Sequence, residues 1–167
     1  MYWMMLRRNS RGYEKDPLAC VYPRIWVGAA CQYTRETAAK HQFTHVINCA
    51  GPEHSPSFVP ADRIVCLSAI DHPEANILHW YPRFEATLER FLRDPDCKNV
   101  YVHCECGINR SAFLALAYVV DRFGLPFMET ARALTEQRPC ALTNRSFWAQ
   151  VEAFAKYRAS KHGSVPQ

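Results

Sequence analysis

The sequence predicts one α/β domain whose central sheet has four to five mostly parallel strands flanked by helices. A length of 167 residues suits a single domain that buries its own core. Short β-rich runs alternate with longer helical patterns, and this alternation is typical of a parallel sheet with helical crossovers. One predicted helix is apolar nearly all round, as a helix packed beneath a sheet should be.

Four β-rich runs are expected to form the main strands, and a shorter run is expected to add an edge strand. In chain order the main strands are Ile25–Val27, Thr44–Cys49, Ile64–Leu67 and Val100–His103, and the edge strand is Cys20–Tyr22.

Apolar side chains at helical spacing predict four helices. From Ile77 to Leu92 they recur at i, i+3, i+4 and i+7, and Pro82 is expected in the first turn, where its missing N–H costs nothing. Ser111–Phe123 is the central apolar helix, and Gly124 ends it. The patterns for the last two helices are Met128, Ala131 and Leu134, and Phe147, Val151 and Phe154.

The ends of the chain differ from the middle. Residues 1–19 open with a short apolar run and are expected to form a helix or an arm that pairs two copies of the chain. The main domain is expected over residues 20–160, with a flexible tail of small and polar residues at 161–167. The positive charges follow the opening apolar run, so we expect no secretory signal.

Composition and charge exclude several classes of protein. A hydrophobic fraction of 49% argues against disorder, and no apolar run of about 18 residues indicates a membrane span. The net charge of +4 is compatible with an anionic substrate but identifies none, and no DNA partner is expected. The 8 cysteines lie scattered through apolar stretches, which is typical of reduced thiols in an intracellular, cytoplasmic or nuclear protein.

The most informative segment is Lys98–Ser111, where a short strand runs into a loop and then directly into the central helix. Backbone N–H groups that converge in such a loop favour an anion, whether a phosphate or a thiolate. Two cysteines compete for the place beneath the phosphate. Five residues separate Cys104 from Arg110, enough to wrap one phosphate, whereas Cys106 leaves three and falls in the loop wall. Cys104 is therefore the predicted nucleophile.

The same segment resembles the signature of the cysteine-dependent protein tyrosine phosphatase superfamily. The matching residues are His103, Cys104, Gly107, Arg110 and Ser111. Over residues 22–155 the chain looks like a small dual-specificity phosphatase of that superfamily. The resemblance implies a protein tyrosine phosphatase-like fold and dephosphorylation of phosphotyrosine, phosphoserine and phosphothreonine in phosphoprotein substrates, with no metal and no cofactor.

The resemblance also implies a role for each matching residue. Cys104 is the nucleophile and Arg110 binds the phosphate and its transition state. Ser111 assists release of the thiolate, and His103 orients the loop. The phosphate-binding loop consists of Glu105, Cys106, Gly107, Ile108, Asn109 and Arg110.

Asp71 is the general acid and base that the resemblance implies. It lies 33 positions before Cys104, and Asn76 follows it at the spacing of that branch's acid loop. Asn76 is expected to cap the next helix and so to brace this loop. Arg138-Pro139 and then Asn144, Phe147 and Gln150 resemble the family's C-terminal segment, and Asn144 is expected to cap the last helix. The family usually has Pro where this chain has Thr143, a departure of little consequence because Asn144 can still cap the helix.

Two other functions stay open at this point. The Asn109–Arg110 pair resembles the loop of RNA 5′-triphosphatases of the superfamily. It also resembles the loop of poxviral-type dual-specificity phosphatases, and a viral protein of this type would act in the host cell. Asp71 favours a protein substrate, because RNA-directed members generally lack that acid. A catalytically silent phosphoprotein-binding module is disfavoured, because such modules usually lose one of Cys104, Arg110 and Asp71.

Three further sites are disfavoured. Phosphoinositide phosphatases of the superfamily usually carry basic residues inside the loop, where this chain has Glu105 and Ile108. A zinc site from His103, Cys104 and Cys106 is disfavoured, because ligands in one tight loop spread poorly into a tetrahedron. A protective disulfide between Cys104 and either Cys106 or Cys49 is a weak alternative.

Overall fold

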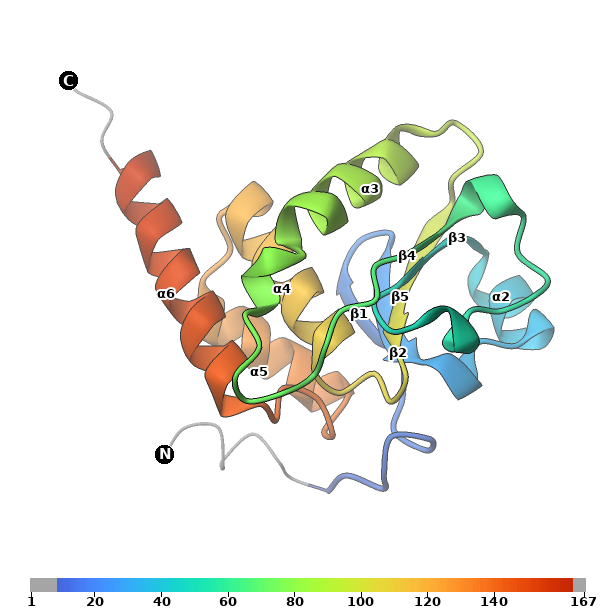
Figure 1. Ribbon diagram of the computed structural model, residues 1–167, viewed down its shortest axis with the longest axis horizontal. Coiled ribbons are helices and arrows are strands. Elements are labelled where there is room, and N and C mark those ends of the chain that lie inside the picture. The colour runs from blue at the N-terminus through green and yellow to red at the C-terminus, as the bar shows by residue number, and fades with distance from the viewer. Residues whose placement is uncertain (1–8, 164–167) are drawn as a thin grey trace.

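A five-stranded sheet forms the centre of the molecule, in the order β1-β2-β5-β3-β4 (Figure 1). The computed structural model describes residues 9–163. β1 and β2 are antiparallel, and β2, β5, β3 and β4 pair in parallel. This mostly parallel sheet with one short edge strand confirms the predicted fold class. The strands are β1 (Ala19–Tyr22), β2 (Ile25–Ala29), β3 (Phe43–Asn48), β4 (Ile64–Cys66) and β5 (Asn99–Cys104).

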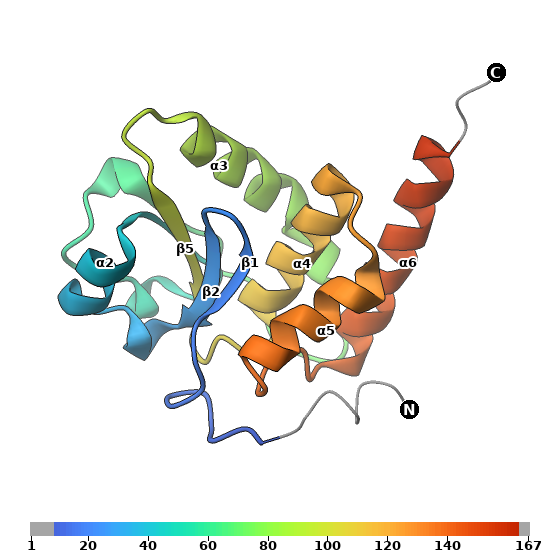
Figure 2. The ribbon, with the colours of Figure 1, turned by 180° about the vertical axis from the view of Figure 1, so that it is seen from behind.

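Helices cover both faces of the sheet (Figures 1 and 2). On one side lie α3 (Tyr81–Arg93), α4 (Arg110–Phe123), α5 (Phe127–Gln137) and α6 (Arg145–His162), and these confirm the four predicted helices. The opposite side carries α2 (Arg35–His41), which was not predicted. Its seven residues form only two turns, capped by the Thr34 hydroxyl and ended by Gln42 in the left-handed conformation.

Three boundaries differ from the prediction. The helix expected from Ile77 is divided into a 3-10 turn, Ile77–His79, and α3, which has Pro82 in its first turn. The tail expected from residue 161 is still helical at its start, because α6 continues to His162. The helix expected within residues 1–19 is absent from the described part, residues 9–18, which forms turns; residues 1–8 and 164–167 lie outside the described residues.

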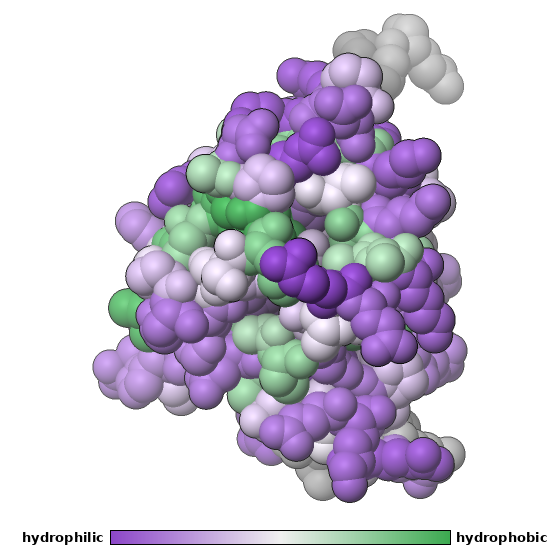
Figure 3. All heavy atoms as spheres, turned by 90° about the vertical axis from the view of Figure 1, so that its right-hand side faces the viewer, coloured by the Kyte–Doolittle hydropathy of each residue, from purple (hydrophilic) through white to green (hydrophobic). Residues whose placement is uncertain are grey.

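The main core lies between the sheet and its four-helix side. Residues 111–121 of α4 are all buried, so this helix has hardly a polar face, as its sequence predicted. On the α2 side a smaller aromatic cluster covers the sheet. Figure 3 shows that side as mainly hydrophilic, with separate hydrophobic areas. The fully or nearly buried members of the smaller cluster are Tyr33, Phe43, Val46 and Tyr101.

A single buried cation connects the N-terminal residues to the loop after β5. Arg138, at the end of α5, has no exposed surface, and its guanidinium donates five hydrogen bonds to backbone carbonyl oxygens. All five N–H groups of the side chain are used in this way, so its burial leaves no donor unsatisfied. The acceptors are the carbonyls of Gly107 (2.9 Å), Cys106 (2.8 Å), Tyr13 (3.0 Å), Asp16 (3.0 Å) and Pro17 (3.0 Å).

His103 is completely buried near the end of β5. Burial lowers the pKa of its imidazole to about 4, against an opposing effect of the hydrogen bond to the Cys104 carbonyl. Because a carbonyl can only accept, Nδ1 is the protonated nitrogen and donates to that oxygen over 3.1 Å. His103 is therefore neutral at pH 7.

Arg138→Met should lower the free energy of unfolding by about 3 kcal/mol or more. The variant keeps apolar bulk but removes the donors of five carbonyls, and a buried group left unsatisfied costs about 1–3 kcal/mol. Urea denaturation would measure the change. Arg132→Met, at an exposed position of the same helix, is the matched control and should stay within about 0.5 kcal/mol of the parent. Equal losses in both variants would contradict the anchoring role.

Acid should destabilise the fold through His103. The pKa of its imidazole is 6.5 in the unfolded chain and about 4 in the folded protein. Above pH 6.5 the ring is neutral in both states, so the contribution of His103 to the free energy of unfolding is then independent of pH. Between these values the unfolding free energy should fall by about 1.4 kcal/mol per pH unit. Urea titrations at several pH values would measure this slope, and His103→Gln should lack it. A ring NMR signal that titrates near pH 6.5 in the folded protein would refute the assignment.

Candidate active site

The loop between β5 and α4 is held by its carbonyl groups. Four consecutive carbonyls, those of residues 105–108, accept hydrogen bonds from the surrounding scaffold. The donor and acceptor pairs are Ala30 N–H to Glu105 (3.0 Å), Arg138 to Cys106 (2.8 Å) and to Gly107 (2.9 Å), and Leu142 N–H to Ile108 (2.7 Å). In a trans peptide the C=O and the following N–H point in opposite directions, so the N–H groups of residues 106–109 point away from this scaffold.

These amides are free to bind an anion. Within residues 9–163, the backbone N–H groups of residues 105–109 have no hydrogen-bond acceptor. They are followed at once by the N-terminus of α4, whose partial positive charge adds to theirs. The loop thus has the donors and the potential that a phosphate group requires.

Gly107 allows the loop to lie close to the sheet. Its φ is +62°, and a Cβ at this position would stand 2.3 Å from the carbonyl carbon of Gly28 on β2. A side chain would therefore be strained in conformation and would also displace the loop from β2.

Cys104 is the last residue of β5, at the base of this loop, and is 2% exposed. Its Sγ lies 3.3 Å from the hydroxyl oxygen of Ser111 in the first turn of α4. The competing cysteine, Cys106, is in a less favourable environment, because burial and the neighbouring Glu105 carboxylate raise the pKa of its thiol. Cys104 therefore differs from Cys106 in place, because it lies at the base of the loop beside Ser111, whereas Cys106 lies in the loop wall.

Arg110 begins α4 and turns its guanidinium toward the loop that carries Asp71. Nη1 donates to the carbonyl oxygen of Ala69 over 3.1 Å, which fixes the plane of the group. Its Nε is buried and has no hydrogen-bond partner among the described residues. Arg110 therefore keeps donors available for a ligand.

Asp71 lies on the loop that follows β4, and side-chain amides hold its carboxylate. Asn109 Nδ2 donates to Oδ2 and Asn144 Nδ2 donates to Oδ1, each over 3.0 Å. Further along, Gln150 of α6 also holds this loop. Its Nε2 donates to the Ala75 carbonyl over 2.9 Å, and its Oε1 accepts from the Ile77 N–H over 2.8 Å. The acid loop is therefore fastened to both the phosphate loop and α6.

The two supporting asparagines cap helices, as expected. The Asn76 side chain accepts from the Leu78 N–H at the 3-10 turn, over 3.1 Å. The Asn144 side chain accepts from the N–H groups of Ser146 and Phe147 at the start of α6. Asn144 thus caps a helix with its oxygen and holds Asp71 with its nitrogen.

The predicted nucleophile, cation and acid line one pocket of about 540 Å³. Cys104, Arg110 and Asp71 all face it, together with the phosphate-loop residues Glu105, Cys106, Ile108 and Asn109. Ser111 and His103 do not line the pocket but contact Cys104 from behind. The sequence analysis predicted neither the role of Arg138 nor the contacts of the Asn109 side chain. For Arg138, the resemblance of Arg138-Pro139 to the family's C-terminal segment was the one available indication.

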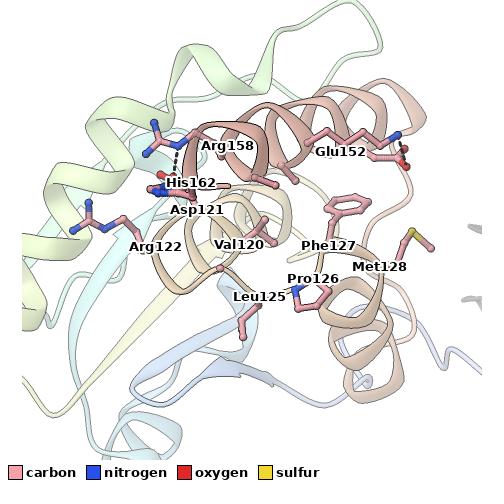
Figure 4. A pocket seen from close by; sticks show the side chains of 14 residues that line it. Val120, Asp121, Arg122, Leu125, Pro126, Phe127, Met128, Glu152, Arg158 and His162 are labelled. Atoms are coloured by element: carbon pink, nitrogen blue, oxygen red, sulfur yellow. Dashed lines mark ion pairs between the residues drawn. The ribbon is translucent and has the colours of Figure 1, made fainter. Parts of the chain in front are cut away.

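A larger hollow of about 650 Å³ lies at the far end of α4, between α5 and α6 (Figure 4). Its floor is apolar and includes Leu125, Pro126 and Phe127, and an ion pair between Arg158 and Asp121 lies at one side. No cysteine and none of the predicted site residues line it. Cys104, Arg110 and Asp71, which the sequence predicts to be catalytic, line the smaller pocket instead.

The chain is similar to several known proteins. Residues 25–157 match the family model "Dual specificity phosphatase, catalytic domain". Mouse dual specificity protein phosphatase 19 is 29% identical over 160 residues, which cover 91% of this chain and 70% of that protein. Mouse serine/threonine/tyrosine-interacting protein is 29% identical over 141 residues, 80% of this chain and 62% of that protein. A probable dual specificity protein phosphatase of Dictyostelium discoideum is 25% identical over 134 residues, 80% of this chain and 33% of that protein.

Solved structures share the fold. Human DUSP28 has a TM-score of 0.72 at 23% identity, over 84% of this chain and 94% of that one. A mouse putative dual specificity phosphatase complexed with zinc tungstate has a TM-score of 0.75 at 23% identity, over 88% of this chain and 91% of that one. The curated relatives are longer: the chain spans from one third to 70% of the three named above. The family model covers most of the chain, and the chain therefore belongs to the dual specificity phosphatase catalytic domain family.

Proposed function

We propose that this protein hydrolyses phosphotyrosine, phosphoserine and phosphothreonine in proteins through a cysteinyl-phosphate intermediate, without a metal ion. One observation carries the proposal: a loop with five backbone N–H groups that have no acceptor within residues 9–163 lies at a pocket that Cys104, Arg110 and Asp71 also line. The amides and the guanidinium supply the positive potential that a phosphoryl group needs in both ground state and transition state.

In the first step the Cys104 thiolate attacks phosphorus, and the bond from phosphorus to the ester oxygen breaks. Asp71 enters protonated and gives its proton to the departing oxygen, while Arg110 and the loop amides bind the equatorial oxygens. The products of this step are the free hydroxyl side chain of the substrate protein and a phosphate bonded to Cys104.

In the second step a water molecule attacks the cysteinyl phosphate. Asp71, now a carboxylate, takes a proton from that water, the bond between sulfur and phosphorus breaks, and inorganic phosphate leaves. The Ser111 hydroxyl, 3.3 Å from Cys104 Sγ, donates a hydrogen bond to the departing thiolate. His103 keeps the Cys104 backbone in place through the carbonyl bond at 3.1 Å.

The charges around the pocket favour a single phosphate group. Glu53, Asp71 and Glu105 contribute carboxylates to its lining, and Arg110 contributes the positive charge at its base. Further phosphates, as in a 5′-triphosphorylated RNA or a phosphoinositide, would meet these carboxylates and be repelled. We therefore place the RNA 5′-triphosphatase below the protein phosphatase.

A binding module without turnover is the remaining alternative. One relative is named for interaction with serine, threonine and tyrosine, and it shares 29% of its aligned residues with this chain. Cys104, Arg110 and Asp71 all line the same pocket here, and binding alone would not require a nucleophile and an acid together. Catalysis is therefore the proposal that uses all three side chains.

We also propose an intracellular location, which covers the cytoplasm, the nucleus and, for a viral protein, the host cell. All eight cysteines are free thiols, as suits a reducing compartment. No helix within residues 9–163 is both long and apolar enough to cross a bilayer. The homodimer through residues 1–19 stays a prediction, and Tyr13, Asp16 and Pro17 of that segment bind Arg138 of their own domain.

Phosphate release should depend on Cys104. Purified protein in EDTA is expected to release phosphate from a phosphotyrosine peptide and from a phosphothreonine peptide. Cys104→Ser should abolish release but still bind the phosphotyrosine peptide, because the amides and Arg110 remain. Cys106→Ser, which changes a thiol in the loop wall, is the matched control and should keep most of the activity.

The same assay separates the alternatives. Cys104-dependent release from 5′-triphosphorylated RNA alone would identify an RNA triphosphatase. Peptide binding without release by the unmodified protein would identify a binding module. Either result would overturn the proposal.

Asp71→Asn should lower the rate on the phosphothreonine peptide by about 100- to 10,000-fold, because the alkoxide then leaves without a proton. The loss should shrink on an aryl phosphate whose phenol ionises near neutral pH, since that oxygen leaves readily as the anion. Steady-state kinetics on both substrates would measure the two losses. Glu74→Gln, at an exposed carboxylate of the same loop, should change neither rate. Equal losses on the two substrates would place the acid elsewhere.

A further inference from the structure

Asn109 is the loop residue whose side chain has the most completely defined orientation. The backbone N–H groups of Thr143 and Asn144 both donate to its Oδ1, each over 2.8 Å. Two N–H donors can share one oxygen acceptor, but neither can donate to an NH2 group. The positions of Oδ1 and Nδ2 in the Asn109 side chain are therefore unambiguous. Its Nδ2 therefore faces Asp71 Oδ2, 3.0 Å away, as a donor.

No part of this amide is left over for a substrate. The oxygen has two lone pairs, which two backbone N–H groups occupy at 2.8 Å, and the Thr143 hydroxyl lies 3.3 Å from the same oxygen. The nitrogen has two hydrogens, and these go to Asp71 Oδ2 and to the Thr143 hydroxyl oxygen, at 3.0 and 3.1 Å. Asn109 is also only 8% exposed. All hydrogen-bonding groups of the Asn109 side chain therefore bind other residues of the protein, so this side chain has none left to recognise an RNA substrate.

Asp71 depends on these amides for its position. The residue is exposed on an irregular loop, where a carboxylate would otherwise rotate freely. One donor on each oxygen, Asn109 on Oδ2 and Asn144 on Oδ1, fixes both torsions of the side chain. Asn109 is the donor that belongs to the phosphate loop itself, so it sets the position of the carboxylate relative to the bound phosphate.

Thr143 supplies three of the five contacts of the Asn109 amide: its backbone N–H donates to Oδ1, and its hydroxyl lies 3.1 Å from Nδ2 and 3.3 Å from Oδ1. The superfamily that this chain resembles usually has Pro at this position, and Pro has neither group. Pro at position 143 would therefore remove the backbone donor and the hydroxyl that orient the Asn109 side chain.

We propose that Asn109 is a positioning residue that holds the general acid Asp71 over the phosphate loop, and that Thr143 orients Asn109 for this purpose. The inference rests on the proposed function, in which Asp71 donates the proton to the leaving oxygen. The Asn109 side chain touches neither the substrate nor the reacting atoms and acts through Asp71, whereas its backbone N–H belongs to the amides of the phosphate loop.

Leaving-group dependence tests this role. Asn109→Ser removes the amide and leaves a neutral hydroxyl that is too short to reach Asp71. It should lower kcat/KM on phenyl phosphate, a leaving group like tyrosine, by about 10- to 100-fold, the usual loss from a displaced catalytic group. On an aryl phosphate whose phenol ionises near neutral pH the loss should stay below about threefold, because that oxygen needs little protonation. Inhibition by inorganic tungstate should be unchanged, since the amides and Arg110 remain.

Thr143 provides the second arm of the experiment. Thr143→Pro should give the same leaving-group pattern as Asn109→Ser, whereas Thr143→Ser keeps both donor groups and is the conservative control. In the Asn109→Ser background, Thr143→Pro should cause no further loss. In an Asp71→Asn background, Asn109→Ser should likewise cause none, because residues that act as one unit are not additive.

Each other outcome overturns the inference. Equal losses on both substrates, or weaker tungstate inhibition, would mean that Asn109 shapes the phosphate loop instead of Asp71. Additive losses with Asp71→Asn would mean that it acts independently. Unchanged kinetics in Asn109→Ser would remove the role. Failure of the proposed function has a different signature, because the unmodified protein would then show no Cys104-dependent turnover. In that case the role proposed for Asn109 is rejected as well.

Discussion

The buried guanidinium of Arg138 is the contact on which the phosphate loop depends. Burying a cation away from water costs several kcal/mol unless hydrogen bonds replace those to water. Here five backbone carbonyls do so, three from residues 13–17 and two from the loop itself. The N–H groups of a guanidinium point in fixed directions within one plane. The N-terminal residues and the loop must therefore both be in place for all five hydrogen bonds to form. A segment remote in sequence is thereby part of the site.

Fixing carbonyls is how the protein makes an anion site from its backbone. Peptide groups have a donor and an acceptor on opposite sides, so turning four consecutive carbonyls toward the scaffold turns the next four N–H groups toward the pocket. The scaffold donors come from the end of β2, the end of α5 and the chain after it. Leu142 adopts a φ of +63°, which is unusual for a residue with a side chain, and its N–H reaches the Ile108 carbonyl.

The two catalytic loops are joined more closely than their separation in the sequence indicates. Arg110 bonds the Ala69 carbonyl, and Asn109 bonds Asp71, 38 positions away. Two successive residues of the phosphate loop thus hold successive parts of the acid loop. The proposed nucleophile, Cys104, lies on a buried strand, where packing fixes it, whereas the proposed acid, Asp71, lies on an exposed loop and needs polar contacts to fix it. This difference explains why the site uses asparagine side chains around Asp71 and none around Cys104.

Most of the fold was determined by the sequence alone. Helices α3 to α6 follow from apolar side chains three and four positions apart, the strands follow from β-rich runs, and the approach of strand, loop and helix around Cys104 follows from their order in the chain. These features depend on neighbours within one or two turns, which a sequence displays directly. The seven residues of α2 are too few for such a pattern to show, and the break between Ile77–His79 and α3 is a local change of helix type that periodicity does not detect.

The contacts that hold the site together became visible in the folded molecule and not before. From the sequence, Asn109 resembled both RNA-directed and poxviral-type enzymes and did not decide between them. Thr143 was a departure of little consequence, and Arg138 was one residue of a C-terminal segment. Their partners lie more than 30 positions away, at Asp71, at Asn109 and at the loop and N-terminal carbonyls. Hydrogen bonds depend on direction and distance in space, and a pattern of residue types along the chain contains neither.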